Sequence, residues 1–207
     1  MASKNPALAI WNIKQQNKTA LAWKIFQVAP VNSAEKINAT LALALAGDER
    51  AIPQLLEILR SSDRTSVNEN LRFSAARRIA ATYLLGKLRS TEAVDLMMKN
   101  LDDWDCEKFF GHTVMALIKI ADSHKKMQQH VGAKLLAKAQ DTSWQMIEQL
   151  KGDGAPVRRS DGLLRLHIAW ALDRWHIKHR IAETVRNIPL DDHEKFLWQN
   201  YFRDKEQ

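Results

Sequence analysis

Residues 45–59 read LAGDERAIPQLLEIL, and this stretch has the features of a tight turn followed by an amphipathic helix. The apolar residues from Ile52 to Leu59 recur at the spacing i, i+3, i+4, i+7, which places them on one face of a helix. Gly47 stands where a preceding helix would end, and Asp48 is a residue type favoured as an N-cap. The stretch therefore predicts a helical hairpin. Its two helices are expected at Ala34–Ala46 and Glu49–Arg60.

The same apolar pattern returns further along the chain. The set that begins at Ala51 lines up with the set that begins at Ala93, at an offset of 42 residues. The run at 84–90 reappears in similar form at 116–122, and a further copy at 171–188 follows at an offset of 87 residues. A helical hairpin that recurs every ~30–50 residues is typical of an α-solenoid. We therefore predict an all-α fold with about four such hairpins over residues 33–190.

Capping helices are expected at both ends of this array, because terminal repeats need a polar outer face. The predicted caps are Asn5–Asn17 and Thr19–Val28 within residues 1–32, and Asp191–Phe202 within residues 191–207. Asp191 or Asp192 would cap the last helix. Polar segments rich in Ser, Asp, Gly or Pro, at 61–69 and 151–161, are expected to be the long loops. The whole chain, 1–207, is expected to form a single repeat domain.

The repeated segments carry a family resemblance. The stretch at 45–59 resembles the HEAT repeat in its phycobilisome-lyase-type variant, and so does the run from Leu71 to Leu101, with its AARR, LLGKL and AVDL elements. The run PVRRSDGLLRL at 156–166 resembles the start of another such repeat. The resemblance implies an α-solenoid of HEAT-like hairpins. It implies little about function, because arrays of this kind include scaffolds, adaptors, lyases and nucleic-acid binders.

Composition excludes several other classes of protein. Hydrophobic residues make up 45% of the 207 residues and charged residues 27%, which does not suit a largely disordered chain. No apolar run approaches the ~20 residues of a membrane span. The single cysteine, Cys106, can form neither an internal disulfide nor a Cys-rich zinc site. The N-terminal segment lacks the apolar stretch of a secretory signal, so we expect a cytoplasmic protein.

The familiar motifs of catalysis are not found in the sequence. It contains neither a Gly-rich phosphate loop nor the GxSxG and HExxH patterns. Asp173, His176 and His179 have a spacing that could serve a metal, but the basic residues among them oppose the binding of a cation. We expect a solvated polar turn there. We also expect no catalytic residue, no metal site and no cofactor.

The formal net charge is +7, and many basic residues gather in the C-terminal half. Along stacked second helices they would form a stripe that binds phosphates or an acidic protein surface. The alternative is a solvated outer face with scattered charge. The candidate basic residues are Lys134, Lys138, Arg158, Arg159, Arg165, Arg174, Lys178 and Arg180.

Seven tryptophans are unusual for a helical repeat array, and aromatic rings beside Arg and Lys can stack on bases. Trp104 and Trp144 fall at turns or helix starts and are candidates for a surface role, whereas Trp170 and Trp175 are expected in the core. The run DDWD at 102–105 resembles the tryptophan–aspartate element of HEAT-like alkylpurine DNA glycosylases. Lys108 stands where that family has a further acid, which puts the catalytic role in doubt.

These features favour a non-enzymatic scaffold that grips a partner protein in a groove lined by the second helix of each hairpin. The expected partner is acidic or presents an amphipathic helix. Two alternatives come from the resemblances. One is a nucleic-acid-binding protein related to the alkylpurine DNA glycosylases, and the other is a factor similar to bilin lyases.

Overall fold

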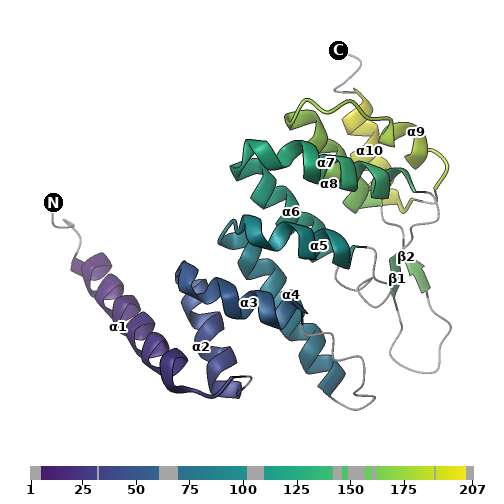
Figure 1. Cartoon of the computed structure of the whole chain (residues 1–207). Helices are drawn as coiled ribbons and strands as arrows, with labels where there is room; N and C mark the ends of the chain where they lie inside the picture. The colour runs from purple at the N-terminus through teal and green to yellow at the C-terminus, as the bar shows by residue number, and fades with distance from the viewer. Residues whose placement is uncertain are drawn as a thin grey trace. The chain divides into compact units, whose positions relative to one another are not determined.

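The computed structural model of the chain describes residues 6–31, 33–60, 70–101, 110–141, 146–148, 157–159, 162–188 and 190–203 (Figure 1). The chain divides into two compact units, Met1–Ser90 and Thr91–Gln207. Helices dominate both units, which confirms the predicted all-α fold. None of the described helices is both long enough and apolar enough to cross a membrane.

The first unit is built from helices in series. Its elements are α1 (Pro6–Val28), α2 (Ala34–Leu45), the 3-10 turn η1 (Glu49–Ala51), α3 (Ile52–Arg60) and α4 (Asn70–Lys87). The hairpin predicted from residues 45–59 is confirmed in α2 and α3. Between them Gly47 has a φ of 85°, and the Asp48 side chain accepts a hydrogen bond from the Arg50 amide at 3.1 Å. Helix α3 buries the predicted apolar face, including Leu55 and Leu59.

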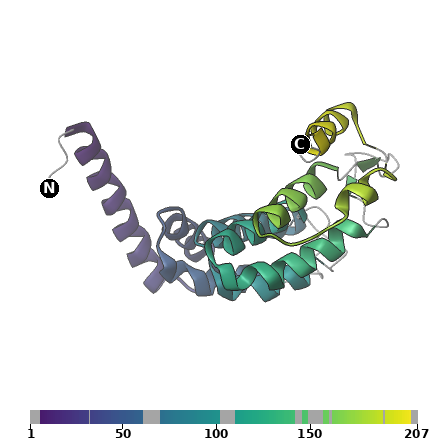
Figure 2. The same cartoon turned by 90° about the horizontal axis from the view of Figure 1, so that it is seen from above.

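The N-terminal segment forms one helix rather than the predicted pair. Figure 2 shows α1 as a single helix without a break. The break predicted near Lys18 was wrong because the polar run there, QQNKT, contains no Gly or Pro that would end a helix. The rings of Trp23 and Phe26 stack with 5.4 Å between their centres, and the guanidinium of Arg50 lies 3.9 Å from the centre of the Trp23 ring.

The second unit continues the series of helices. Its elements are η2 (Thr91–Ala93), α5 (Val94–Asn100), α6 (Phe110–Ser123), α7 (Lys125–Gln140), β1 (Met146–Glu148), β2 (Val157–Arg159), α8 (Gly162–Arg174), α9 (Ile181–Val185) and α10 (Asp192–Arg203). The strands β1 and β2 pair antiparallel, with Met146 opposite Arg159. Strand β2 lies within residues 151–161, which were predicted to form a loop. The sequence did not indicate a strand there, because three residues are too few to show the alternation of apolar and polar side chains.

Three described helices, α2, α4 and α8, end in the same kind of turn. In this Schellman motif a residue just after the helix takes a left-handed conformation, and the next amide reaches back to a carbonyl in the last turn. The left-handed residues are Gly47 (φ 85°), Arg89 (φ 56°) and His176 (φ 57°). The accepting carbonyls belong to Leu43, Leu85 and Leu172. In each set the second residue follows the first by 42 positions, and the third follows the second by 87 positions. These are the offsets at which the apolar pattern of the sequence repeats.

The left-handed residues give a first stability prediction. Non-glycine residues pay about 1–2 kcal/mol in this conformation, so His176→Gly should raise the free energy of unfolding by about 0.5–1 kcal/mol. Gly47→Ala should lower it by about 1 kcal/mol for the same reason. Denaturant titrations of both variants check this. His176→Ala is the matched control, because it removes the imidazole and keeps the strain; a gain equal to that of His176→Gly would contradict the explanation.

The core of the second unit is apolar and tightly packed around α6, α7 and α8. Leu117, Leu135 and Leu172 are fully buried, and Trp175 is buried as predicted. Trp170 was predicted in the core and is instead 39% exposed. Helix α8 is apolar on almost every side, so its sequence pattern does not reveal which side faces outward.

Helix α10 begins with a capping box, and one residue of this box, Glu194, also contacts the start of α8. Asp191 accepts a hydrogen bond from the Glu194 amide at 2.8 Å, and Glu194 accepts one from the Asp191 amide at 3.1 Å. The other carboxylate oxygen of Glu194 accepts a hydrogen bond from the amide of Leu163, in the first turn of α8. A Cβ atom on Gly162 would lie only 2.4 Å from the Leu190 side chain, so the close approach depends on glycine.

Candidate functional site

One of the predicted surface residues, Arg165, lies inside the fold. It is completely buried, and its guanidinium donates hydrogen bonds to the carbonyls of Ala139 and Asp141. These carbonyls lie at the C-terminal end of α7, where the helix dipole favours a positive charge. The burial corrects the prediction that placed Arg165 on a basic surface stripe. Its charge stabilises the end of a helix instead.

Arg174 is engaged in a contact between α8 and α6. Its guanidinium lies 2.9 Å from a carboxylate oxygen of Asp122, and both side chains are partly exposed. The indole N–H of Trp175 donates to the other oxygen of Asp122 at 2.8 Å. Asp122 thus ties the C-terminal end of α8 to the C-terminal end of α6.

The two lysines of α7 lie apart from the other predicted basic residues. A step of two residues turns a helix by about 200°, so Lys134 and Lys138 project from the side of α7 opposite to Leu136. Leu136 and Gln140 line a pocket together with Lys178 and Arg180. The predicted stripe is therefore divided between two sides of α7.

The remaining candidates cannot be placed at the level of the side chain. Trp104 and Trp144 lie outside the described residues. Arg158 and Arg159 belong to β2, where the description is limited to the backbone.

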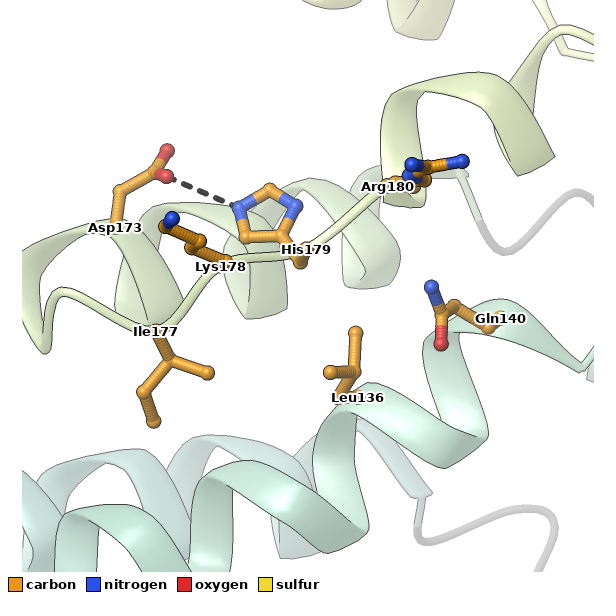
Figure 3. A pocket seen from close by; sticks show the side chains of 7 residues that line it. All are labelled: Leu136, Gln140, Asp173, Ile177, Lys178, His179 and Arg180. Atoms are coloured by element: carbon orange, nitrogen blue, oxygen red, sulfur yellow. Dashed lines mark hydrogen bonds and ion pairs between the residues drawn. The ribbon is translucent and has the colours of Figure 1, made fainter.

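The pocket has a volume of about 720 Å³ and lies between α7 and the segment that connects α8 to α9 (Figure 3). The side chains of Lys178 and Arg180 are exposed at its rim. Within the described part of the chain neither side chain forms an ion pair. The lining residues are Leu136, Gln140, Asp173, Ile177, Lys178, His179 and Arg180.

A helix-terminal turn and a glycine of α7 position the segment that lines one side of this pocket. The Schellman turn at His176 ends α8 and sends the chain past α7. A Cβ atom on Gly132 would lie 2.4 Å from the Cδ1 atom of Ile177, so the glycine leaves room for that side chain against α7. The following residues, Lys178 to Arg180, then face the last turns of α7.

A hydrogen-bonded network stands behind the pocket. Asp173 accepts a hydrogen bond from the hydroxyl of Tyr201 at 2.9 Å, and its other oxygen lies 3.0 Å from Nε2 of His179. Burial, and then the hydrogen bond to Asp173, raise the pKa of Tyr201 well above its ordinary value, so the hydroxyl keeps its proton. Because a carboxylate only accepts hydrogen bonds, Nε2 of His179 carries a proton.

The second ring nitrogen of His179 has no such contact. The side chain is only 3% exposed, and its Nδ1 atom is buried without a hydrogen-bond partner among the described residues. Figure 3 shows the ring with one nitrogen directed at Asp173 and the other turned away from it. A buried polar atom that lacks a partner costs about 1–3 kcal/mol, and native folds avoid this.

Part of this arrangement could be predicted from the sequence. Asp173, His176 and His179 were recognised as neighbours and expected to form a solvated polar turn. That expectation is wrong for His179, which is buried, whereas His176 is exposed. No group of three metal-binding side chains gathers among the described residues. Tyr201 was predicted only as an apolar residue of the last helix, and no local signal links it to Asp173, 28 residues earlier.

Serial hairpins that share one type of turn at matching offsets define the chain as a helical repeat protein. Two of its segments, residues 36–61 and 77–103, match the family model of the PBS lyase HEAT-like repeat, in agreement with the resemblance. The first of these segments spans α2 and α3. Neither a comparison with curated proteins nor one with solved structures finds a match.

Proposed function

We propose that this protein is a non-enzymatic binding protein whose second unit binds an acidic partner protein. The observation that carries the proposal is the pair of exposed cations, Lys178 and Arg180, at the rim of the pocket beside α7. The one carboxylate that lines the pocket, Asp173, is already engaged by His179 and Tyr201. The lining therefore offers an excess of positive charge to an incoming group.

The environments of the other basic residues support this choice of surface. Arg165 is used inside the core and Arg174 is paired with Asp122, so neither offers a free charge. Exposed cations at the rim of an interface accelerate association with an acidic surface and disfavour basic partners. Helical repeat arrays commonly present such surfaces to partner proteins.

Charge reversal at the rim tests the proposal. The probe is a fluorescein-labelled, end-blocked 20-residue helical peptide of Glu and Ala, measured by fluorescence anisotropy at two salt concentrations. We expect Lys178→Glu/Arg180→Glu to weaken binding about tenfold or more, equivalent to about 1.4 kcal/mol, because two attractive contacts become repulsive. The melting temperature should change little, since both side chains are exposed.

The matched control is Lys125→Glu/Lys126→Glu, which makes the same change of charge in the first turn of α7, far along the helix from Leu136. This control should change the affinity less than about twofold. Equal losses in the two double variants would show a general charge effect and contradict the proposed surface. Duplex and single-stranded DNA of the same length test the nucleic-acid alternative, for which log K would fall with log salt by about 0.9 per phosphate contact on duplex.

A further inference from the structure

We infer that the outer side of α1, in the first unit, is a docking surface for an acidic amphipathic helix of a partner protein. The inference goes beyond the proposed function, which concerns the pocket of the second unit, and it does not depend on that function. It rests on three exposed aliphatic side chains and on the two lysines that border them.

One side of α1 is fixed against α2 by aromatic and cationic side chains. The stacked rings of Trp23 and Phe26 lie on this side, and the guanidinium of Arg50 lies 3.9 Å from the centre of the Trp23 ring. Nζ of Lys36, in α2, lies 4.1 Å from the centre of the Phe26 ring. Ala22 is buried on the same side, and Figure 1 shows α2 beside α1. These contacts determine which side chains of α1 face outward.

The opposite side of α1 carries an exposed apolar stripe. Leu21, Ile25 and Val28 are 60%, 36% and 83% exposed. At about 100° per residue they fall within about 60° of one another around the helix, on successive turns. A helix that caps a repeat array is normally polar on its outer side, whereas contiguous exposed apolar side chains indicate an interaction site. The stripe is therefore a surface for a partner to cover.

The charges beside the stripe favour an acidic occupant. Around the helix axis Lys24 borders the stripe next to Val28, and Lys18 borders it next to Ile25. Both lysines are exposed, and the sequence of α1 contains no Asp or Glu. A helix that presents apolar residues at the same spacing, bordered by Asp or Glu, complements the stripe in both hydrophobicity and charge.

Two other occupants fit this surface less well. A second copy docked through the same side would bring the lysines of two α1 helices together, with no acid in either helix to pair with them. Helices that lie in a membrane surface place Trp, Phe or Leu on their apolar side, whereas Trp23 and Phe26 are on the side packed against α2. The stripe spans about 10 Å, which suits the crossing of two helices.

A designed peptide tests the surface on the full-length chain. The probe is a fluorescein-labelled helical peptide with Leu at heptad positions a and d and Glu at e and g, where like charges oppose pairing of the peptide with itself. Its scrambled form keeps the composition and the net charge. Anisotropy is measured in the Lys178→Glu/Arg180→Glu background, so that the pocket rim of the second unit does not contribute. The amphipathic form should bind about tenfold or more tightly than the scrambled form.

Substitutions within the stripe identify the surface. We expect Leu21→Gln/Val28→Gln to weaken binding of the Leu/Glu peptide about tenfold or more, because two apolar contacts are lost. Glutamine is a good helix former and both positions are exposed, so the circular dichroism and the melting temperature should change little. The matched control, Met115→Gln/Leu163→Gln, removes two exposed apolar side chains of the second unit and should change the affinity less than about twofold.

Charge reversal beside the stripe provides the second measurement. Lys18→Glu/Lys24→Glu should weaken binding of the Leu/Glu peptide about tenfold or more, because two attractive contacts become repulsive. The same variant should bind a matched peptide with Lys in place of Glu more tightly than the parent chain does. A loss of folding would weaken the binding of both peptides, so the exchange of preference reports on the surface itself.

The outcomes distinguish this inference from the proposed function. Equal binding of the amphipathic and scrambled peptides, or unchanged affinity in Leu21→Gln/Val28→Gln, overturns the docking surface and leaves the proposed function standing. Binding that depends on the stripe, in a protein whose pocket rim does not bind the Glu/Ala peptide, supports the surface and removes the proposed function. Binding to vesicles of phosphatidylcholine and phosphatidylserine in equal parts, or dimerisation in sedimentation, that is lost in Leu21→Gln/Val28→Gln overturns the helix as the occupant.

Discussion

Arg165→Ala is expected to lower the free energy of unfolding by about 3–5 kcal/mol, since it removes a buried charge that satisfies two buried or partly buried carbonyls. The guanidinium donates to the carbonyls of Ala139 and Asp141 at the end of α7. Alanine would leave these acceptors without their donors and would open a cavity in the core beneath α8. Denaturant unfolding followed by circular dichroism measures the change.

Two further variants make this result interpretable. Arg165→Met keeps most of the side-chain volume and loses the donors, so its loss of stability should be smaller than that of Arg165→Ala by the cavity contribution. Arg174→Ala removes an arginine of the same helix that is exposed and paired with Asp122, and it should change stability by about 1 kcal/mol or less. Similar losses in Arg165→Ala and Arg174→Ala would contradict the buried role of Arg165.

Trp198→Ala is expected to have an effect of similar size, about 3–5 kcal/mol, because a buried aromatic side chain leaves a large cavity. The indole is buried, and its N–H donates to the Gly162 carbonyl at 3.0 Å. Its ring also meets Tyr201 edge to face, with 5.2 Å between the ring centres. Loss of the indole should weaken the docking of α10 on α8, so hydrogen exchange of the α10 amides should become faster.

The control for this variant lies on the same helix. Phe196 is 60% exposed, so Phe196→Ala removes an aromatic ring from α10 with an expected change of about 0.5 kcal/mol or less. Trp198→Phe fills part of the cavity and should recover part of the stability. If Phe196→Ala were as destabilising as Trp198→Ala, the buried indole would not be what holds α10.

Much of the fold could be predicted because its signals are local. The end of α2 is indicated by Gly47, and the start of the turn that leads into α3 is indicated by Asp48. The repeat offsets of 42 and 87 residues, found from apolar side chains, return in the backbone turns at Arg89 and His176. Those two turns carry no glycine, so the sequence did not reveal their left-handed residues, although it predicted a polar turn around His176.

The candidate site could be predicted only in part. Lys178 and Arg180 were chosen for their charge, and the structure places both at an exposed pocket rim. His179 was noticed for its spacing from Asp173 and was then assigned to solvent. Its side chain is buried beside a long-range contact, in which Tyr201 of α10 donates a hydrogen bond to Asp173.

The sequence by itself determined the class of structure, because helical periodicity, caps and turn residues act within a few positions of one another. The tertiary structure decided whether each basic residue is buried, paired or exposed. Arg165 lies in the core, Arg174 pairs with Asp122, and Lys178 remains exposed. Charge is a property of a residue type, whereas burial and pairing depend on which helix packs against it. These contacts join residues up to 52 positions apart, beyond the reach of any local pattern.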